Sequence, residues 1–353
     1  MIIDVLKNYF SDNEVIKAQP FGNGHINDTF KVDLAGIPIS YILQRINSNV
    51  FKNPRGIIDN HLRLQEHYLS YDQSISITKL VPNAKGDFIT FDDNGDAWRL
   101  TDFINDSYSI EIIDRSWQAF EAGFAFGSFA NNCNKLNPND FIEAIKDFHR
   151  LSFRLKQLTE AIENDRAGRL KSVKSLVDFF KQREGKLADI QNLVDMEAIP
   201  LRVVHNDTKI NNLLFRGDKA VAIVDLDTLG PGILFNDYGD ALRTIACTSR
   251  EDEKDISKVS FNFDAFTEFS KGYLNQVKGI VTKAEKEYFY LAPVLLTFIM
   301  GIRFLTDFLN GDIYYKISYP NHNIDRCKVQ VALIESMESR EAEMKSIINE
   351  LLS

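Results

Sequence analysis

Cysteine is scarce in this chain, and signals for export or membrane insertion are weak. The three cysteines lie far apart and form no C-x-x-C pair: Cys133, Cys247 and Cys327. Neither a disulfide framework nor a cysteine zinc site is therefore expected, and a reducing cytoplasm suits these thiols. The first ten residues lack the basic flank, apolar core and small-residue cleavage site of a signal peptide.

The most apolar segment, residues 288–305, is too interrupted for a membrane span. It contains Pro293, Gly301 and Arg303, whereas a spanning helix needs about 20 predominantly apolar residues. The segment therefore predicts a buried helix in a helical domain, and no membrane partner is expected.

An excess of positive charge is absent too. The chain has 41 Lys and Arg against 50 Asp and Glu, a net charge of −9, and no dense basic patch. Nucleic acid is therefore not an expected partner. A length of 353 residues predicts two lobes instead of one small core. Small molecules are the expected partners, and the sequence favours a monomer without deciding the oligomeric state.

The most informative segment of the chain is a polar motif, HNDTKINN at residues 205–212, which is followed by IVDLD at 223–227. It has the H-x-D-x-K-x-x-N spacing of a phosphoryl-transfer catalytic loop. In such a loop Asp207 accepts the proton of the attacking hydroxyl, and Lys209 reaches the transferring phosphate. Asn212 and Asp225 offer oxygen ligands to the Mg²⁺ ions that bridge the phosphates of ATP. The motif predicts a kinase.

The residues around this motif predict a rigid frame for it. Apolar runs at 201–204, 213–215 and 220–224, with a turn-like stretch at 216–219, indicate strand, loop, strand, turn and strand, ending at Asp225. Strands on both sides would fix the reactive side chains relative to one another, which phosphoryl transfer requires.

Residues 1–105 have the pattern of a small strand-rich lobe. Strands are predicted at 15–20, 29–34, 41–46, 76–81, 88–91 and 97–103, with a helix at 56–71 and a hairpin at 93–96. The segment FGNGHIN lies between the first two strands, where glycines let backbone amides approach phosphates. Gly22, Asn23 and Gly24 are thus expected at the nucleotide, with His25 and Asn27 directed into the cleft.

Residues 106–353 predict a larger helical lobe, with residues 104–109 as the hinge. Helical periodicity begins with the aromatic segment around 117–129 and recurs at 141–163, 170–193, 237–248, 263–275, 284–309 and 328–352. The expected fold class is therefore α+β and bilobal, with a small antiparallel-sheet N-lobe and a mostly helical C-lobe.

Two further groups of polar residues need a role. Asp237 follows the motif at the start of a predicted helix and is expected to brace the loop by accepting hydrogen bonds from backbone amides or from His205, which itself organises the loop. Arg303 and Asp307 are spaced i, i+4, so an intrahelical salt bridge is the default. An arginine in so apolar a helix is costly without a partner, so Arg303 is equally a substrate-facing residue, with Tyr314 beside it.

The chain resembles the aminoglycoside phosphotransferase and choline kinase superfamily, whose fold is protein-kinase-like, and within it the N-acetylhexosamine 1-kinases. The resemblance rests on matching stretches in both lobes: PFGNGHIN (20–27), YILQRIN (41–47), PLRVVHNDTKINN (200–212), IVDLDT (223–228), FNDYGDALR (235–243) and GIRFLTDFLNGDIYY (301–315). It implies ATP- and Mg²⁺-dependent phosphorylation of the anomeric hydroxyl of N-acetylglucosamine or N-acetylgalactosamine.

The resemblance also implies residue roles. Asp207 is the base, Asn212 and Asp225 are magnesium ligands, and Asp227 is a metal or sugar contact. The sugar-side residues are His25, Asn27, Arg303 and Tyr314. One departure is Gln44, which stands where protein kinases have the phosphate-binding lysine and is itself a nucleotide-binding candidate. Its neighbour Arg45 points to the opposite face of the strand.

Two alternatives remain open at this level. A kinase of the same type acting on another alcohol, such as an aminoglycoside or choline, would carry the same catalytic loop. A non-catalytic binding protein on a kinase-like fold would explain the missing lysine, although Asp207, Asn212 and Asp225 argue against it.

Overall fold

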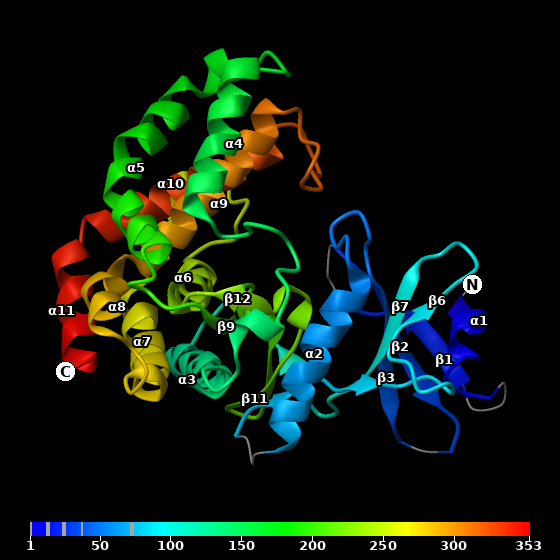
Figure 1. The fold of residues 1–353 in the computed structure, drawn as a ribbon. Coiled ribbons are helices and arrows are strands. Elements are labelled where there is room, and N and C mark those ends of the chain that lie inside the picture. Colours follow the sequence, from blue (N-terminus) through cyan, green and yellow to red (C-terminus); the bar gives the residue numbers. More distant parts are fainter. Residues whose placement is uncertain (1, 12–14, 23–25, 37, 71–73) are drawn as a thin grey trace.

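The computed structural model describes residues 2–11, 15–22, 26–36, 38–70 and 74–353. They form two lobes, one built on an antiparallel sheet and a larger one that is mostly helical (Figure 1). The predicted α+β fold class, with a small sheet lobe and a helical C-lobe, is confirmed. The division at residue 105 stays a prediction.

The N-lobe sheet separates an apolar face from a polar one. Its strand order is β1-β2-β3-β7-β5, with β6 paired to β7. The strands are β1 (Val15–Pro20), β2 (Asp28–Leu34), β3 (Ser40–Arg45), β5 (Leu80–Val81), β6 (Thr90–Phe91) and β7 (Ala97–Asp102). Val32, Leu43 and Leu100 pack on one face with helix α1 (Ile2–Leu6), which the sequence did not predict. The opposite face carries Gln44 and Arg99, which are direct cross-strand neighbours.

Helix α2 (Pro54–Leu69) lies between the sheet and the C-lobe (Figure 1). It begins at Asn53, whose side chain caps the helix by accepting from the Gly56 N–H. The buried Asn60 side chain donates to the carbonyls of Ile142 and Leu229, both at 2.8 Å, and accepts from the Ile142 N–H at 3.0 Å. The helix is therefore hydrogen-bonded to the C-lobe.

Short strands form the frame of the catalytic motif. The order is β4-β11-β10-β8 in one sheet and β12-β9 in the other. These strands are β4 (Ser76–Ile77), β8 (Tyr108–Ser109), β9 (Arg202–Val204), β10 (Leu213–Arg216), β11 (Lys219–Ile223) and β12 (Gly230–Gly232). The predicted strand at 76–81 is in fact two strands, because β4 pairs with β11 whereas β5 pairs with β7. Strand β8, inside the expected hinge, pairs with β10.

The helices of the C-lobe match most of the predicted ones. They are α3 (Ser116–Cys133), α4 (Leu151–Asn164), α5 (Lys174–Asp195), α6 (Leu234–Ile245), α7 (Phe263–Val277), α8 (Lys283–Tyr288), α9 (Ala292–Leu309), α10 (His322–Glu338) and α11 (Glu341–Leu351). The helix predicted over 141–163 begins only at Leu151, because Asn60 holds Ile142 and Asp147 takes a φ of 53°. The helix predicted over 328–352 is split between α10 and α11.

Helices α3 and α7 approach each other closely through glycines. A Cβ atom on Gly123 would lie 2.1 Å from the carbonyl oxygen of Phe269, and one on Gly272 would lie 2.3 Å from that of Phe120. Side chains at these positions would push the backbones apart, so the glycines set the spacing of the two helices.

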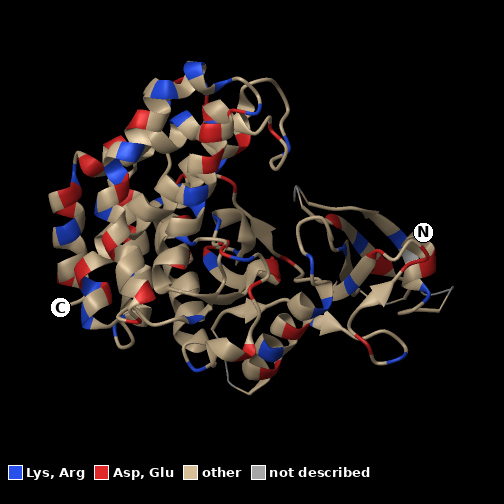
Figure 2. Cartoon of the chain, turned by 45° about the horizontal axis from the view of Figure 1, so that its top comes forward, with Lys and Arg blue, Asp and Glu red and all other residues tan. Residues whose placement is uncertain are grey.

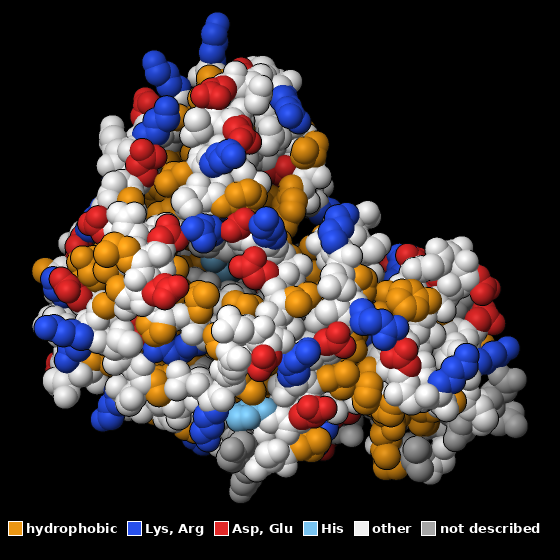
Figure 3. Space-filling view, in the orientation of Figure 1, with side chains coloured by type: hydrophobic (Ala, Val, Ile, Leu, Met, Phe, Trp, Pro, Cys, Tyr) orange, Lys and Arg blue, Asp and Glu red, His pale blue; other side chains and the backbone are white. Residues whose placement is uncertain are grey.

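The apolar segment 283–309 is long and apolar enough to cross a membrane, but 94% of its apolar window is buried inside the protein. Its larger part, from Ala292 to Leu309, is the core helix α9, so most of the segment 288–305 lies in a buried helix as predicted. On the outside, Lys and Arg alternate with Asp and Glu along the helices (Figure 2). The surface is hollowed between the N-lobe and the arm that α4 and α5 build (Figure 3).

Candidate active site

The catalytic motif forms a loop, residues 205–212, between β9 and β10, and one carboxylate anchors its start. The two oxygens of the fully buried Asp237 accept the backbone N–H groups of His205 at 2.9 Å and Asn206 at 2.7 Å. Burial raises the pKa of Asp237 to about 6, although the hydrogen bonds from these two amides favour the ionised carboxylate. The His205 ring lies 3.0 Å from the Val224 carbonyl and accepts the Asp207 N–H at 3.2 Å. Asp237 thus braces the loop through backbone N–H groups, which was one of the two expected possibilities, and not through the His205 ring.

Asp207 lies at the centre of the loop, held by its two motif partners. Its carboxylate is 3.0 Å from the Lys209 ammonium, and the Asn212 amide donates to its carbonyl at 2.8 Å and to its carboxylate at 3.3 Å. Although burial favours the protonated acid, the charge of Lys209 holds the pKa of Asp207 below its usual value. The carboxylate of Asp207 in turn raises the pKa of Lys209. Both groups are therefore charged at neutral pH.

Asp225 lies two residues after the end of β11, in a left-handed conformation with a φ of 61°. No described residue donates a hydrogen bond to its carboxylate, which keeps contact with solvent. Its pKa is raised to about 7, first because protein atoms displace water around it and then because Asp227 and Asp207 are negatively charged. The Asn212 carbonyl accepts the N–H of the preceding residue Val224, so Asn212 and Asp225 are neighbours.

Asp225 forms no ion pair within 4 Å among the described residues, and its carboxylate and the side-chain oxygen of the neighbouring Asn212 are oxygen ligands of the kind that Mg²⁺ prefers. Within the described ranges no cluster of three or more His, Cys, Asp or Glu side chains is arranged for a metal ion. Magnesium at a nucleotide needs no such cluster, because phosphates and water complete its shell. Asn212 and Asp225 are therefore a suitable pair for it.

Asp227 is engaged by the N-lobe. Its carboxylate forms an ion pair with Arg99, in which both side chains are 3% exposed, and accepts from the Asn27 amide at 2.5 Å. The Asn27 side chain also accepts the Asn47 N–H at 3.0 Å. Gln44 binds the other edge of the Arg99 guanidinium. The structure thus brings Asn27, Gln44 and Asp227 together, although the sequence assigned them to three different ligands.

The glycine-rich segment is described only at its ends. Gly22 has a φ of 78°, a conformation that favours glycine. Asn23, Gly24 and His25 lie outside the described residues, so their expected roles at the nucleotide and the sugar stay predictions.

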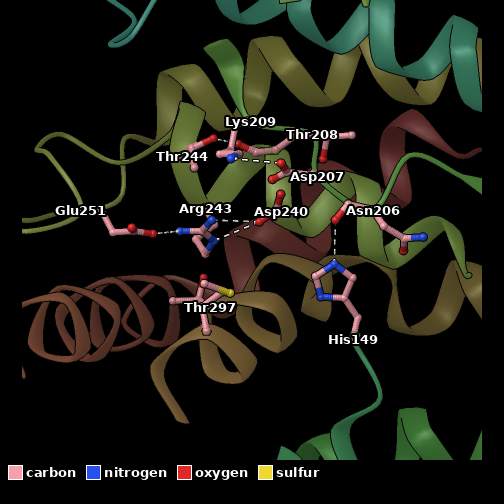
Figure 4. A network of polar contacts seen from close by, with 12 residues as sticks. His149, Asn206, Asp207, Thr208, Lys209, Asp240, Arg243, Thr244, Glu251 and Thr297 are labelled. Carbon is pink, nitrogen blue, oxygen red and sulfur yellow. Dashed lines mark hydrogen bonds and ion pairs between the residues drawn. The ribbon is translucent and has the colours of Figure 1, made fainter. Parts of the chain in front are cut away.

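A second acidic residue, missed from the sequence, lies beside the catalytic loop. Figure 4 shows Asp240 between Arg243 and Asp207. Arg243 donates to Asp240 at 2.9 and 3.1 Å and to Glu251 at 2.7 Å. The i, i+3 spacing in DYGDALR was the available signal. Arg243 offsets the charge of Asp240 and also helps to lower the pKa of Asp207.

Arg303 reaches the other side of the site from the apolar helix α9. It is 8% exposed, and no described carboxylate lies within ion-pair distance of it. Its guanidinium carbon lies 4.7, 5.6 and 5.9 Å from the ring centres of Phe148, Tyr315 and Tyr314. Its one hydrogen-bond partner in the described chain is the sulfur of Met300, at 3.2 Å. Such a cation keeps unused N–H donors.

The salt bridge expected between Arg303 and Asp307 does not form. The buried Asp307 carboxylate instead accepts the backbone N–H groups of residues 313–315 at 2.8 to 3.0 Å and the amide of Asn323 at 2.9 Å. Asp307 therefore holds the loop that presents Tyr314, whose side chain is 55% exposed, next to Arg303.

Two more residues on this side were missed from the sequence because they lie in or after the segment predicted as helix. The His149 ring is 2.8 Å from the Asn206 carbonyl (Figure 4), and burial lowers its pKa to about 4. Arg154 donates twice to the Phe148 carbonyl. Burial, and then the charge of Arg303, lower the pKa of Arg154 to about 10. This side of the site thus carries two arginines, neither of which forms an ion pair with a described carboxylate.

The two lobes, the strand-framed loop and its charged residues define a phosphotransferase of kinase-like architecture. The model of the phosphotransferase enzyme family matches residues 17–257, well over half of the chain, and the chain belongs to that family. Membership of this family makes the protein a phosphotransferase.

Solved structures of this type share the whole fold at low sequence identity. An aminoglycoside phosphotransferase from Alicyclobacillus acidocaldarius superimposes with a TM-score of 0.63 at 11% identity, covering 99% of this chain and 95% of that one. A microcompartment-associated aminopropanol kinase gives 0.60 at 14% identity, with 98% of each chain covered. A choline kinase from Cryptosporidium parvum gives 0.58 at 12%, covering 99% and 98%. These likenesses concern the fold alone.

Proposed function

We propose that this protein transfers the γ-phosphoryl group of ATP to the anomeric hydroxyl of an N-acetylhexosamine, giving the sugar 1-phosphate. The observation that carries the choice of acceptor is Arg303, a buried cation among aromatic rings with no carboxylate partner in the described chain. The position of the phosphate at C1 rests on the sequence resemblance.

The charge of the acceptor side favours an uncharged acetamido sugar over an amine. Several proteins of similar structure are named for amine substrates, such as aminopropanol and choline. Arg303 and Arg154 both lie on the acceptor side, so an ammonium group placed there would meet like charges. An acetamido group suits the same place, because its carbonyl accepts N–H donors and its methyl packs on aromatic rings such as Phe148 and Tyr315. Aminoglycosides, choline and aminopropanol are therefore the less favoured acceptors.

In the proposed reaction Asp207, ionised at neutral pH, accepts a hydrogen bond from the C1 hydroxyl and takes its proton as the O–P bond forms. The bond between the γ-phosphorus and the β-phosphate oxygen breaks, and ADP leaves. Lys209 offsets negative charge on the transferring group. Asn212 and Asp225 would hold Mg²⁺, which when bound neutralises the phosphate oxygens.

An acceptor screen with ATP and Mg²⁺ tests the proposal. The panel is N-acetylglucosamine, N-acetylgalactosamine, glucose, the cationic glucosamine, glucuronate, choline and kanamycin, with the phosphate located by ³¹P–¹³C coupling. We expect turnover of the two N-acetylated sugars with phosphate at C1. Preference for glucosamine, choline or kanamycin would contradict the role given to Arg303, and phosphate at C6 would contradict the anomeric assignment.

The catalytic role of Asp207 has its own test. Asp207→Asn should lower kcat by about three orders of magnitude or more, because removing an essential base costs several kcal/mol of transition-state stabilisation, while binding of ADP is kept. Asp218→Asn, the same change in the exposed turn of the same hairpin, is the control. Near-normal turnover of Asp207→Asn would overturn the assignment and favour the non-catalytic alternative.

A further inference from the structure

Protein kinases bind the ATP phosphates with a lysine that pairs with a glutamate of the following helix. Both residues are missing here. Gln44 occupies the lysine's place on β3, and no carboxylate of α2 faces it, because Asp59 and Glu66 are both exposed. The polar residue that α2 buries nearby is His61, whose ring lies 2.7 Å from the Thr78 carbonyl. The Lys–Glu pair of other kinases is therefore replaced as a unit.

A different ion pair lies at the same place. Arg99, on β7, is the direct cross-strand neighbour of Gln44. The Gln44 side-chain oxygen accepts from the guanidinium of Arg99 at 2.7 and 3.0 Å, and the Gln44 amide donates to the Thr29 hydroxyl at 3.1 Å. These bonds fix which edge of the guanidinium turns toward the C-lobe, where it meets Asp227.

The cations on the neighbouring strands β2 and β3 are directed elsewhere. Arg45 pairs with Asp28 and Asp96. Lys31 pairs with Asp33 at 3.6 Å and lies over the ring of Phe103.

Arg99 is therefore the cation that β7 holds beside the turn carrying Asp225, the residue suited to the metal. A guanidinium offers a rigid, permanently charged fork, which suits both a carboxylate and a phosphate.

We propose that Arg99, oriented by Gln44, is the positioning residue that replaces the kinase lysine, and that Asp227 is its counter-ion and not a metal ligand. Arg99 holds Asp227, and through it the turn of Asp225, in the conformation that receives the phosphates of the nucleotide. The inference rests on the proposed function, because it assumes that the ligand is a nucleoside polyphosphate. It does not depend on which acceptor is phosphorylated.

Binding experiments without an acceptor test the first part. Arg99→Gln should weaken binding of Mg-ADP, measured by calorimetry, by about tenfold or more, while adenosine, which lacks phosphates, binds within about twofold of wild type. Arg45→Gln, the same change on the opposite face of the sheet, should leave both unchanged. Equal losses for ADP and adenosine, or an unchanged ADP affinity, would overturn the role of Arg99. Failure of the wild type to bind ADP would instead remove the proposed kinase function.

A double-mutant cycle tests the counter-ion role of Asp227. If Asp227 serves Arg99, Asp227→Asn should weaken binding of Mg-ADP about as much as Arg99→Gln does, and the double variant should bind no worse than either single variant, because each change breaks the same ion pair. The double variant with Arg99→Gln should then melt at a higher temperature than Arg99→Gln alone, because an unpaired buried carboxylate is removed. A metal ligand predicts the opposite: a large rise in the Mg²⁺ requirement and a double variant that binds Mg-ADP worse than either single one. That result would overturn the proposal.

Discussion

Acidification from pH 7 to pH 5 is expected to destabilise the protein through His61. This imidazole is 2% exposed, its Nε2 lies 2.7 Å from the Thr78 carbonyl, and its Nδ1 has no hydrogen-bond partner in the described chain. Burial, and then the charge of Arg99, lower its pKa from 6.5 to about 4. Since the unfolded chain takes up the proton first, stabilisation that is complete above pH 6.5 is lost as the pH falls toward 4.

The size of the effect follows from these two pKa values. Near pH 5 the unfolded state binds almost one proton more than the folded state at this site. Integrating that difference from pH 7 to pH 5 gives a loss of about 2 kcal/mol in the free energy of unfolding. His61→Gln keeps an N–H donor for the Thr78 carbonyl and does not titrate, so its stability should fall by about 2 kcal/mol less over the same interval.

Urea unfolding at pH 5, 6 and 7, followed by circular dichroism, measures the difference between the two pH dependences. The comparison uses only the change in the free energy of unfolding with pH. A packing defect at the new side chain, which lowers the stability of His61→Gln at every pH, therefore does not affect it. His67→Gln, the same change on a less buried histidine of α2, is the control and should alter the pH dependence less. Parallel curves for wild type and His61→Gln would refute the reasoning, as would an equal effect at His67.

Four further substitutions have clear expectations. Gly123→Ala should destabilise the protein by about 2 kcal/mol or more, because the new Cβ would meet a backbone oxygen of α7. Gly185→Ala, in the exposed part of α5, should instead stabilise the protein by about 0.5–1 kcal/mol. Thermal unfolding measures both, and similar shifts for the two variants would contradict the close packing of α3 on α7. Glu285→Gln should cost about 3–5 kcal/mol in urea unfolding, because it leaves the buried Arg202 without its charged partner; a loss under about 1 kcal/mol would speak against that pair. Asp307→Asn should raise the acceptor KM several-fold with the ATP KM unchanged, since it loosens the loop at 313–315; an equal change in both KM values would contradict this.

The sequence predicted the parts of the site that a local pattern encodes. HNDTKINN fixes a loop whose residues contact one another over a few positions, and flanking apolar runs predict the strands that frame it. The bracing of His205 and Asn206 by Asp237 was foreseen because the helix start follows the loop closely in the chain. The fold class followed from the change of periodicity near residue 105.

The parts that were missed depend on contacts between distant segments. The position of Arg99 beside Gln44 depends on the register of β3 with β7, and its ion pair is with the distant Asp227. No local sequence pattern shows either contact. The segment at 141–150 has helical periodicity, yet hydrogen bonds from Asn60 hold its start outside a helix. Tertiary contacts there outweigh the local propensity. The expected pair of Arg303 and Asp307 failed similarly, since backbone N–H groups of a later loop take the carboxylate.

The anchoring of α2 by Asn60 has a consequence for how the nucleotide site opens. Three buried hydrogen bonds and the following strand β4 attach this helix to the C-lobe. A rotation of the N-lobe sheet relative to α2 would therefore bend the chain at residues 46–53 and 103–107, and also between β4, which pairs with the C-lobe strand β11, and β5, which pairs with β7. The outward swing of the equivalent helix, by which protein kinases are switched off, would break all three bonds. We expect this enzyme to be controlled by its substrates and not by a displaced helix.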